Sequence, residues 1–244
     1  MLRSVLEIAW PPVCEGCGDA YYSGDTPGLC DSCLEARLFP LTEPYCEVCG
    51  QSYRGKMPSH LQCSNCRNRY LEFDFAVGAY DAEGEIMDWI HRFKYAQEIH
   101  FARMFGKLMT RVWEDNRMAA QKEWIVVPVP LHRKRLRERG FNQSLEIARE
   151  WMRHSPPDQK MRIVNALKRD RYTTRQATLD RRERLTNLHD AFSLSRAGRR
   201  CPQDANFIIV DDVLTTGTTA SECATVLREA FSPNKITVIT VLRG

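Results

Sequence analysis

The sequence predicts an α/β protein, in which a parallel sheet with helices on both faces follows a small cysteine-rich module. Eight of the ten cysteines form four Cys-x-x-Cys pairs within the first 70 residues. From residue 71 onward, short apolar runs alternate with amphipathic helical stripes, as an α/β sheet requires. A chain of 244 residues can hold one medium-sized domain and a small module. We therefore expect the module at 1–70 and the α/β domain at 71–244.

The bulk composition is ordinary for a globular protein, with 43% hydrophobic and 27% charged residues. The net charge of +4 is unevenly distributed, because residues 1–70 carry slightly more acid than base while 133–139 and 168–184 are strongly basic. Affinity for polyanions is therefore expected in the second half of the chain. No stretch approaches the roughly 18 apolar residues of a membrane span, and the first residues do not resemble a signal peptide. These features predict a cytoplasmic protein without a membrane span.

The cysteine pairs form an internal repeat. The Cys-x-x-Cys-Gly knuckle that begins at Cys14 recurs 32 residues later at Cys46, and the plain pair that begins at Cys30 recurs 33 residues later at Cys63. Two thiolates three positions apart on a tight turn can bind one zinc ion, and a second such pair completes a tetrahedral site. The repeat therefore favours two consecutive four-cysteine zinc sites, each structural because four sulfurs leave no open coordination position.

These two sites would be formed by Cys14, Cys17, Cys30 and Cys33, and by Cys46, Cys49, Cys63 and Cys66. The even spacing leaves a crossed pairing open. A single zinc site is a second alternative, and a disulfide framework is a third, disfavoured by the expected cytoplasmic location. The two remaining cysteines are expected to be structural: Cys223 lies on an apolar helical stripe and Cys201 in a polar loop.

Periodicity predicts the elements of the α/β domain in order. Strands are expected at 73–80, 124–130, 164–167, 207–210 and 236–242. Helices are expected at 86–93, 100–115, 141–152 and 219–231. A long polar loop at Arg169–Thr186 separates the fourth strand from the short one before it.

Residues suited to phosphate and sugar binding follow the strand Phe207–Val210. Asp211 and Asp212 come directly after it, and Thr215–Thr219 lead into the next helix. Ligands of open parallel sheets bind at the carboxyl ends of strands, and a helix N-terminus offers free N–H groups to a phosphate. Gly217 permits close backbone approach, while neighbouring carboxylates can accept hydrogen bonds from a vicinal diol such as ribose. The absence of Gly-Lys-Ser/Thr excludes a nucleoside-triphosphate P-loop.

This segment, FIIVDDVLTTGTT at Phe207–Thr219, resembles the phosphoribosyl-pyrophosphate (PRPP) signature of type I phosphoribosyltransferases. The whole chain resembles the ComF family of competence-associated proteins, including its N-terminal double zinc ribbon. Further matching segments are Val127–Arg135, Arg139–Gln143, and Arg171–Leu179 with Arg184 and Asn187. The resemblance implies a type I phosphoribosyltransferase-like sheet for residues 71–244.

The resemblance also implies a role for each candidate residue. Asp211 and Asp212 would hold the ribose hydroxyls, and the 5′-phosphate would bind to Thr215, Thr216, Gly217, Thr218 and Thr219. The loop Pro128–Arg135 would receive pyrophosphate, with Arg133 as its main charged contact. Mg²⁺ would be held mainly by PRPP oxygens and water. The polar loop would close as a flap over C1 of the ribose and exclude water, with Arg171 and Arg175 as the catalytic candidates.

Three functions are compatible with these residues. The first is transfer of phosphoribosyl from PRPP to an acceptor, which the sequence does not identify. The second is a sensor that binds PRPP without turnover. The third is a single-stranded DNA adaptor in DNA uptake, acting with other competence proteins. Its DNA-binding residues would be Arg133, Lys134, Arg135, Arg137 and Arg139, with Phe141 and Tyr172 available for base stacking.

Overall fold

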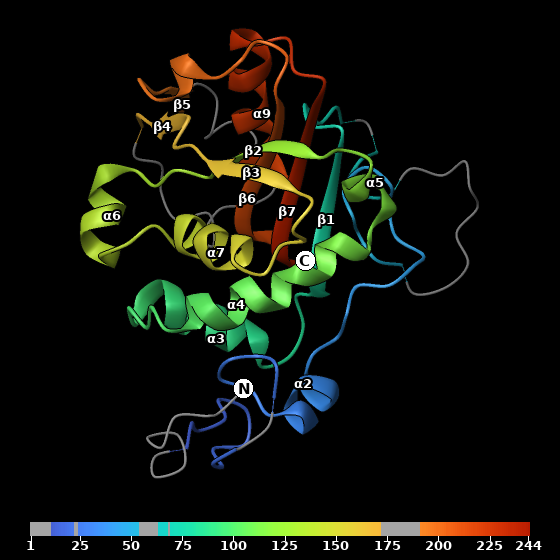
Figure 1. Ribbon diagram of the computed structural model, residues 1–244, viewed down its shortest axis with the longest axis vertical. Coiled ribbons are helices and arrows are strands. Elements are labelled where there is room, and N and C mark those ends of the chain that lie inside the picture. The colour runs from blue at the N-terminus through green and yellow to red at the C-terminus, as the bar shows by residue number, and fades with distance from the viewer. Residues whose placement is uncertain (1–10, 22–23, 54–62, 68, 172–190) are drawn as a thin grey trace.

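The computed structural model describes residues 11–21, 24–53, 63–67, 69–171 and 191–244. Within these residues the chain forms a five-stranded parallel sheet in the order β1-β7-β6-β2-β3 (Figure 1). Its strands are β1 Phe75–Asp81, β2 Glu123–Pro128, β3 Lys160–Ile163, β6 Asn206–Leu214 and β7 Lys235–Arg243. The predicted α/β class is confirmed.

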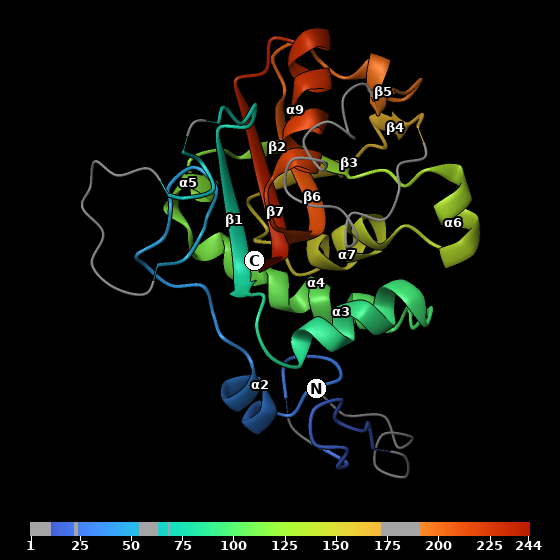
Figure 2. The same cartoon turned by 180° about the vertical axis from the view of Figure 1, so that it is seen from behind.

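Both faces of the sheet are covered by helices, which explains the continuous apolar runs of the central strands. In β6, Ile208 and Val210 belong to one core and Phe207 and Ile209 to the other. The first face is covered by α3 Ile86–Tyr95, α4 Phe101–Leu108 and α7 Gln143–Met152, and the second by α9 Thr218–Ala230 (Figures 1 and 2). Cys223 of α9 is buried in the hydrophobic core on this second face of the sheet, as its apolar stripe predicts, and Cys201 is buried in the same core.

Two predicted elements are divided in the structure. The helix expected at 100–115 ends as α4 at Leu108 and continues as the 3-10 helix η1 Met109–Glu114, before α5 Asn116–Ala119. The strand expected at 164–167 is wrong. Strand β3 ends before it, and β4 Leu167–Arg169 begins at its last residue and pairs antiparallel with β5 Phe192–Leu194. The apolar residues between β3 and β4 are connecting chain whose Ala166 is fully buried, because the 3-10 helix η3 Gly198–Arg200 packs against its carbonyl.

The end of the loop expected at Pro128–Arg135 is helical, because the basic segment forms the helix α6 Arg133–Arg139. The His132 side chain caps its first turn by accepting a hydrogen bond from the Lys134 amide at 3.2 Å. Gly140 ends the helix in the left-handed region, with φ of 83°. Short capping signals on both sides therefore define a helix in a segment with almost no apolar residues.

The two cysteine units have the same backbone hydrogen bonds, which confirms the repeat. The Cys14 amide donates to the Asp19 carbonyl at 2.9 Å, and the Cys46 amide donates to the Gln51 carbonyl at 2.8 Å. The glycine after each knuckle has a positive φ, of 79° and 67°, which explains why both units carry glycine there. The first unit continues into the short helix α2 Asp31–Arg37.

The two units contact different parts of the α/β domain (Figures 1 and 2). The first, with α2, lies beside α3 and α4, and the second runs along the outer side of β1. The Ala76 amide donates to the Val48 carbonyl, and the Asp81 amide to the Phe39 carbonyl, both at 2.8 Å. These bonds cover the edge strand, which otherwise could pair with another chain. Across the described ranges, every helix is too short or too polar to cross a membrane.

Candidate functional site

The cysteine side chains form two compact clusters. In each cluster the four sulfur atoms lie within 4.8 Å of one another, and all ten cysteines are free thiols. The members are Cys14, Cys17, Cys30 and Cys33 in the first cluster, and Cys46, Cys49, Cys63 and Cys66 in the second. The pairing is therefore consecutive, and neither the crossed pairing nor a disulfide framework is formed.

The sulfur spacing fits tetrahedral zinc. Four sulfurs each about 2.3 Å from a zinc ion lie about 3.8 Å apart. In the second cluster Cys46 and Cys66 are separated by 3.9 Å, and Cys49 and Cys63 by 3.4 Å. A hydrogen bond from the Cys46 thiol and the nearby charge of Arg243 lower the pKa of Cys49 to about 5, and the same hydrogen bond raises the pKa of Cys46 to about 12, so Cys49 is the thiolate of this pair. The clusters are two zinc-binding sites, each with four cysteine ligands.

The two aspartates lie at the carboxyl end of β6, inside the strand rather than after it, because pairing with β7 continues to Leu214. Asp212 is 3% exposed, and its Oδ1 forms an ion pair with Lys94 Nζ at 2.8 Å. Its buried Oδ2 accepts no hydrogen bond from any described residue. The Ser144 hydroxyl donates to Asp211 Oδ1 at 2.9 Å. One buried carboxylate oxygen of the pair thus has no donor among the described residues.

The two carboxylates also repel each other. Burial and the neighbouring charge of Asp212 raise the pKa of Asp211 to about 7, although Lys94 and Ser144 act in the opposite direction. Near neutral pH the pair therefore carries less than its full negative charge. A ligand that brings hydroxyl donors or a cation to this strand end relieves the repulsion.

The loop Thr215–Thr219 forms the turn into α9. Gly217 is the N-cap of this helix, with φ of 77°, and it offers no side-chain acceptor to the amides of the first turn. The hydroxyls of Thr216 and Thr218 lie 2.9 Å apart and hydrogen-bond to each other. The turn has the backbone conformation and the helix position that suit a bound phosphate.

A cavity of about 410 Å³ brings the predicted residues together. Its lining includes Asp211, Asp212, Thr215, Thr216, Gly217, Thr218, Thr219, Arg135 and Arg139. Arg133 does not line it. Because α6 is a helix, Arg135 and Arg139 share one face toward the cavity, while Arg133, Lys134 and Arg137 are exposed. Of the expected pyrophosphate loop Pro128–Arg135, the cavity is therefore lined by Arg135 rather than by Arg133, and Arg139 joins it from beyond that loop.

Two cationic residues of the cavity were not predicted from the sequence. Lys94 comes from α3, and Arg169 is the last residue of β4 and only 9% exposed. Burial and the nearby charge of Arg135 lower the pKa of Arg169 to about 10. Arg169 was the first residue of the expected flap. Arg171 is exposed and outside the cavity lining, and Arg175 lies outside the described residues.

Each zinc site should be lost separately. Changing Cys14 to Ser or Cys46 to Ser is expected to reduce the zinc content of the purified protein from two ions per chain to one, and to lower the melting temperature, because structural zinc contributes its binding energy to folding. Inductively coupled plasma mass spectrometry measures the zinc. The control is Cys201→Ser, a buried cysteine outside both clusters, which should keep both ions. A count near zero in the wild type would contradict the assignment.

The raised pKa of Asp211 predicts a pH-dependent cost of folding. The folded protein keeps this proton up to about pH 7, whereas the unfolded chain loses it near 3.8, so stability is lost as pH rises between these values. Asn at position 211 cannot ionise. The free energy of unfolding of Asp211→Asn should therefore rise by about 1–2 kcal/mol relative to that of the wild type as the pH increases from about 5.5 to about 8. Urea unfolding without ligand measures the difference. Equal behaviour of this variant and the exposed control Asp88→Asn would show that the pair is not strained.

Comparison with known proteins agrees with this architecture. A family model described as a double zinc ribbon domain matches residues 5–68. The chain is 30% identical over 208 residues to competence protein F of Haemophilus influenzae, covering 83% of this chain and 85% of that protein. It is 31% identical over 205 residues to the DNA utilization protein YhgH of Escherichia coli, covering 82% and 84%.

A third relative is more distant. The competence protein ComFC of Bacillus subtilis is 26% identical over 228 residues, covering 88% of this chain and 84% of that protein. These matches extend over both the zinc-binding module and the α/β domain. The chain belongs to the family of competence protein F, the ComF family.

Proposed function

We propose that the cavity at the carboxyl end of the sheet binds PRPP, and that the protein acts in DNA uptake. One observation carries the ligand assignment: a single cavity joins the Asp211–Asp212 pair to a Thr/Gly turn at the N-terminus of α9. The acids suit the two ribose hydroxyls, and the turn suits the 5′-phosphate. The names of the relatives, competence protein and DNA utilization protein, support the process.

The charges of the cavity fit the rest of PRPP. Lys94, Arg135, Arg139 and Arg169 line it together with the two aspartates. More cations than acids therefore face a ligand whose 5′-phosphate and pyrophosphate are strongly negative, and guanidinium groups match phosphate oxygens bidentately. The unpartnered Asp212 Oδ2 supports this proposal, because a ligand hydroxyl would supply the hydrogen bond that it lacks among the described residues. Mg²⁺ would arrive with PRPP, held by the oxygens of the ligand and by water.

The reaction that this arrangement suits is phosphoribosyl transfer. The bond from ribose C1 to the pyrophosphate oxygen breaks, pyrophosphate leaves with the bonding electrons, and C1 bonds to an acceptor. Positive charge develops on the ribose, so closure of the segment with Arg171 and Arg175 would serve to exclude water. A PRPP sensor differs only in lacking turnover. Pyrophosphate release from PRPP and Mg²⁺, assayed with candidate acceptors, separates the two.

A second function, binding of single-stranded DNA, is favoured by the outer face of α6. Arg133, Lys134 and Arg137 are exposed on it, and the half-exposed Tyr95 of α3 lies beside Arg139 with the guanidinium 5.3 Å from the ring. Exposed cations beside an accessible ring are what a flexible nucleic-acid strand requires, with phosphates on the former and a base on the latter. Arg133, Lys134 and Arg137 lie outside the cavity lining, whereas Tyr95 and Arg139 also line the cavity, so the two surfaces adjoin at this pair.

PRPP with Mg²⁺ is expected to raise the melting temperature, because the ligand binds only the folded state. Asp212→Ala removes an acceptor and Gly217→Val obstructs the phosphate turn, so both variants should lose the shift. The matched control is Gly140→Val, since Gly140 has a similar positive φ of 83° but lies outside the cavity lining. It should be destabilised by on the order of 1–2 kcal/mol by backbone strain and still respond to PRPP. Calorimetry or thermal denaturation measures the change in melting temperature on adding PRPP. If both cavity variants keep this change, PRPP does not bind in the cavity.

Single-stranded DNA is expected to bind with an affinity that falls steeply with salt, because each neutralised phosphate releases counterions. Arg133→Glu with Arg137→Glu should weaken binding at least tenfold for all sequences and leave PRPP stabilisation intact. The control reverses Lys122 and Lys160, two exposed lysines at the amino ends of β2 and β3. It makes the same change in net charge. Fluorescence anisotropy of a labelled oligonucleotide measures both, and equal losses would mean that only overall charge matters.

A further inference from the structure

We propose that the second zinc site positions the loop Thr215–Thr219, and that Arg243 is the residue that connects them. The proposal rests on the proposed function in one respect, because it takes this loop to be the phosphate-binding segment. It assigns to the zinc ribbon a role in the ligand site itself rather than in folding of the N-terminal module alone.

Arg243 is the last residue of β7 and is only 1% exposed. On one side its guanidinium reaches the second zinc site, where Nε donates to the Cys49 carbonyl at 2.6 Å and Nη2 to the Cys49 sulfur at 3.2 Å. On the other side Nη1 donates to the carbonyls of Leu214 at 2.9 Å and Thr215 at 2.8 Å. One planar, rigid group therefore contacts both a zinc ligand and the first residue of the loop.

The charge of Arg243 ties this contact to the metal. A buried guanidinium is costly unless a negative group lies beside it. No described Asp or Glu forms an ion pair with Arg243; its guanidinium contacts the Cys49 sulfur and also donates from Nη1 to the backbone oxygen of Gly244. Zinc bound by four thiolates would have a net charge of −2 and would place negative charge directly beside the guanidinium. The loaded site thereby favours the one position of the guanidinium that also holds Leu214 and Thr215.

The other half of the second zinc unit holds the same loop. Arg69, three residues after Cys66, donates from Nη1 to the Thr216 carbonyl at 3.0 Å and from Nη2 to the Thr218 hydroxyl at 3.1 Å. Asn65, between Cys63 and Cys66, donates to the same Thr216 carbonyl at 3.3 Å. The carbonyls of residues 214, 215 and 216 are thus all bound from the side of the zinc unit. Fixing these carbonyls fixes the peptide planes of the turn and hence the direction of its N–H groups.

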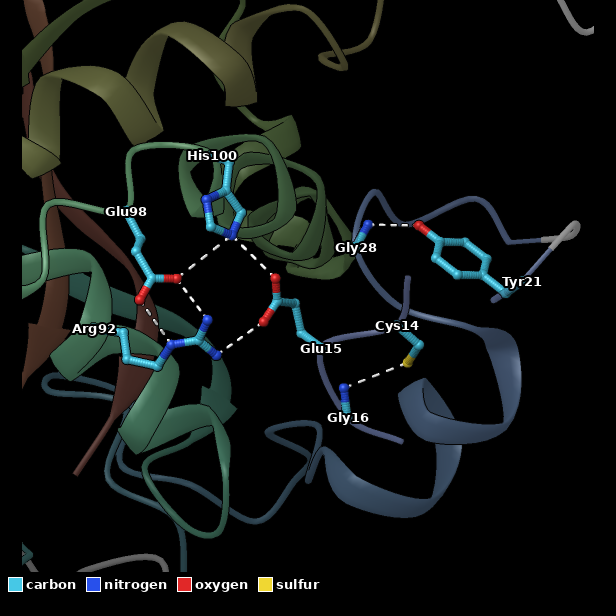
Figure 3. Close-up of polar contacts among 8 residues, drawn as sticks. All are labelled: Cys14, Glu15, Gly16, Tyr21, Gly28, Arg92, Glu98 and His100. Atoms are coloured by element: carbon cyan, nitrogen blue, oxygen red, sulfur yellow. Dashed lines mark hydrogen bonds and ion pairs between the residues drawn. The ribbon is translucent and has the colours of Figure 1, made fainter. Parts of the chain in front are cut away.

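The first zinc unit offers an internal comparison, because the polar contacts of its described residues reach α3 and the start of α4 rather than the loop. Glu15, inside its first knuckle, forms an ion pair with Arg92 at 2.8 Å and a hydrogen bond with His100 at 3.0 Å (Figure 3). Arg37 of α2 pairs with Glu85 before α3. These side chains are 21–54% exposed, so water screens the contacts. The two zinc sites have the same ligands, but the second contacts a loop that lines the cavity, whereas the first contacts helices beside it.

The test compares Arg243→Lys with Arg92→Lys, the same change at the first unit. Lysine keeps the charge but carries it on one nitrogen, which cannot span Cys49 and Thr215 as the guanidinium does. In hydrogen-exchange mass spectrometry of the ligand-free protein, peptides covering 214–219 should exchange at least tenfold faster in Arg243→Lys. They should be unchanged in Arg92→Lys. Both variants should retain two zinc ions per chain, which separates loss of positioning from loss of metal.

A second measurement uses the reciprocity of coupled sites. With both zinc ions replaced by cadmium-113, the protein should give two resonances, assigned with Cys46→Ser. PRPP with Mg²⁺ should move only the resonance of the second site, and this response should disappear in Arg243→Lys. Movement of the first site alone, or an equal response in Arg243→Lys, would refute the connection.

The outcomes distinguish this proposal from the proposed function. If PRPP does not bind the wild type, the proposed ligand is wrong, while hydrogen exchange still decides whether Arg243 orders the loop. If PRPP binds the wild type and Arg243→Lys equally and loop exchange is unchanged, the ligand assignment stands and the positioning role falls. Should Arg243→Lys fail to fold, Arg69→Lys takes its place, because it removes only the contacts to Thr216 and Thr218. Unchanged loop exchange in that variant would overturn the proposal.

Discussion

Two carboxylates held side by side at the buried end of the central strand constrain the rest of the site. Asp211 and Asp212 repel each other strongly enough to raise the pKa of Asp211, already raised by burial, to about 7. Lys94 from α3 and Ser144 from α7 partly offset that repulsion, at 2.8 and 2.9 Å. Side chains from helices on one face of the sheet are therefore required to offset the repulsion between the two carboxylates at the end of β6. Such a stored cost is common where a ligand is to supply the remaining compensation.

The cavity around this pair is chemically divided. Its acids lie at the end of β6, the Thr/Gly turn follows them, and the cations come from α3, α6 and β4. A ligand with vicinal hydroxyls and phosphate groups at both ends satisfies all three regions together, whereas a simple anion satisfies only some of them. The basic helix α6 belongs to two surfaces, because Arg135 and Arg139 face the cavity while its other cations face solvent. Ligand binding and nucleic-acid binding would thus share one helix.

The repeated zinc units have diverged in what they support. Their knuckles have equivalent backbone hydrogen bonds and equivalent glycines, so the metal chemistry is the same in both. The first unit lies beside α3 and α4 through exposed ion pairs, and the second covers the edge of β1 and contacts the loop before α9. The two similar metal-binding units therefore have different neighbours, one at helices and the other at the sheet edge and the loop before α9.

Features that depend on local periodicity could be predicted from the amino-acid sequence. The α/β class, the cysteine repeat and the Thr/Gly turn at Thr215–Thr219 follow from spacing along the chain, because burial on a strand, a helix face or a tight turn repeats at fixed short intervals. Other features depended on how distant segments pack. The grouping of the cysteines into two sites depended on which knuckles meet in the folded chain. Because α6 is a helix, Arg135 and Arg139 line the cavity and Arg133 does not. Lys94 and Arg243 meet their partners across more than a hundred residues of sequence. A polar contact between distant segments leaves no periodic signal in either segment, so only the folded chain reveals it.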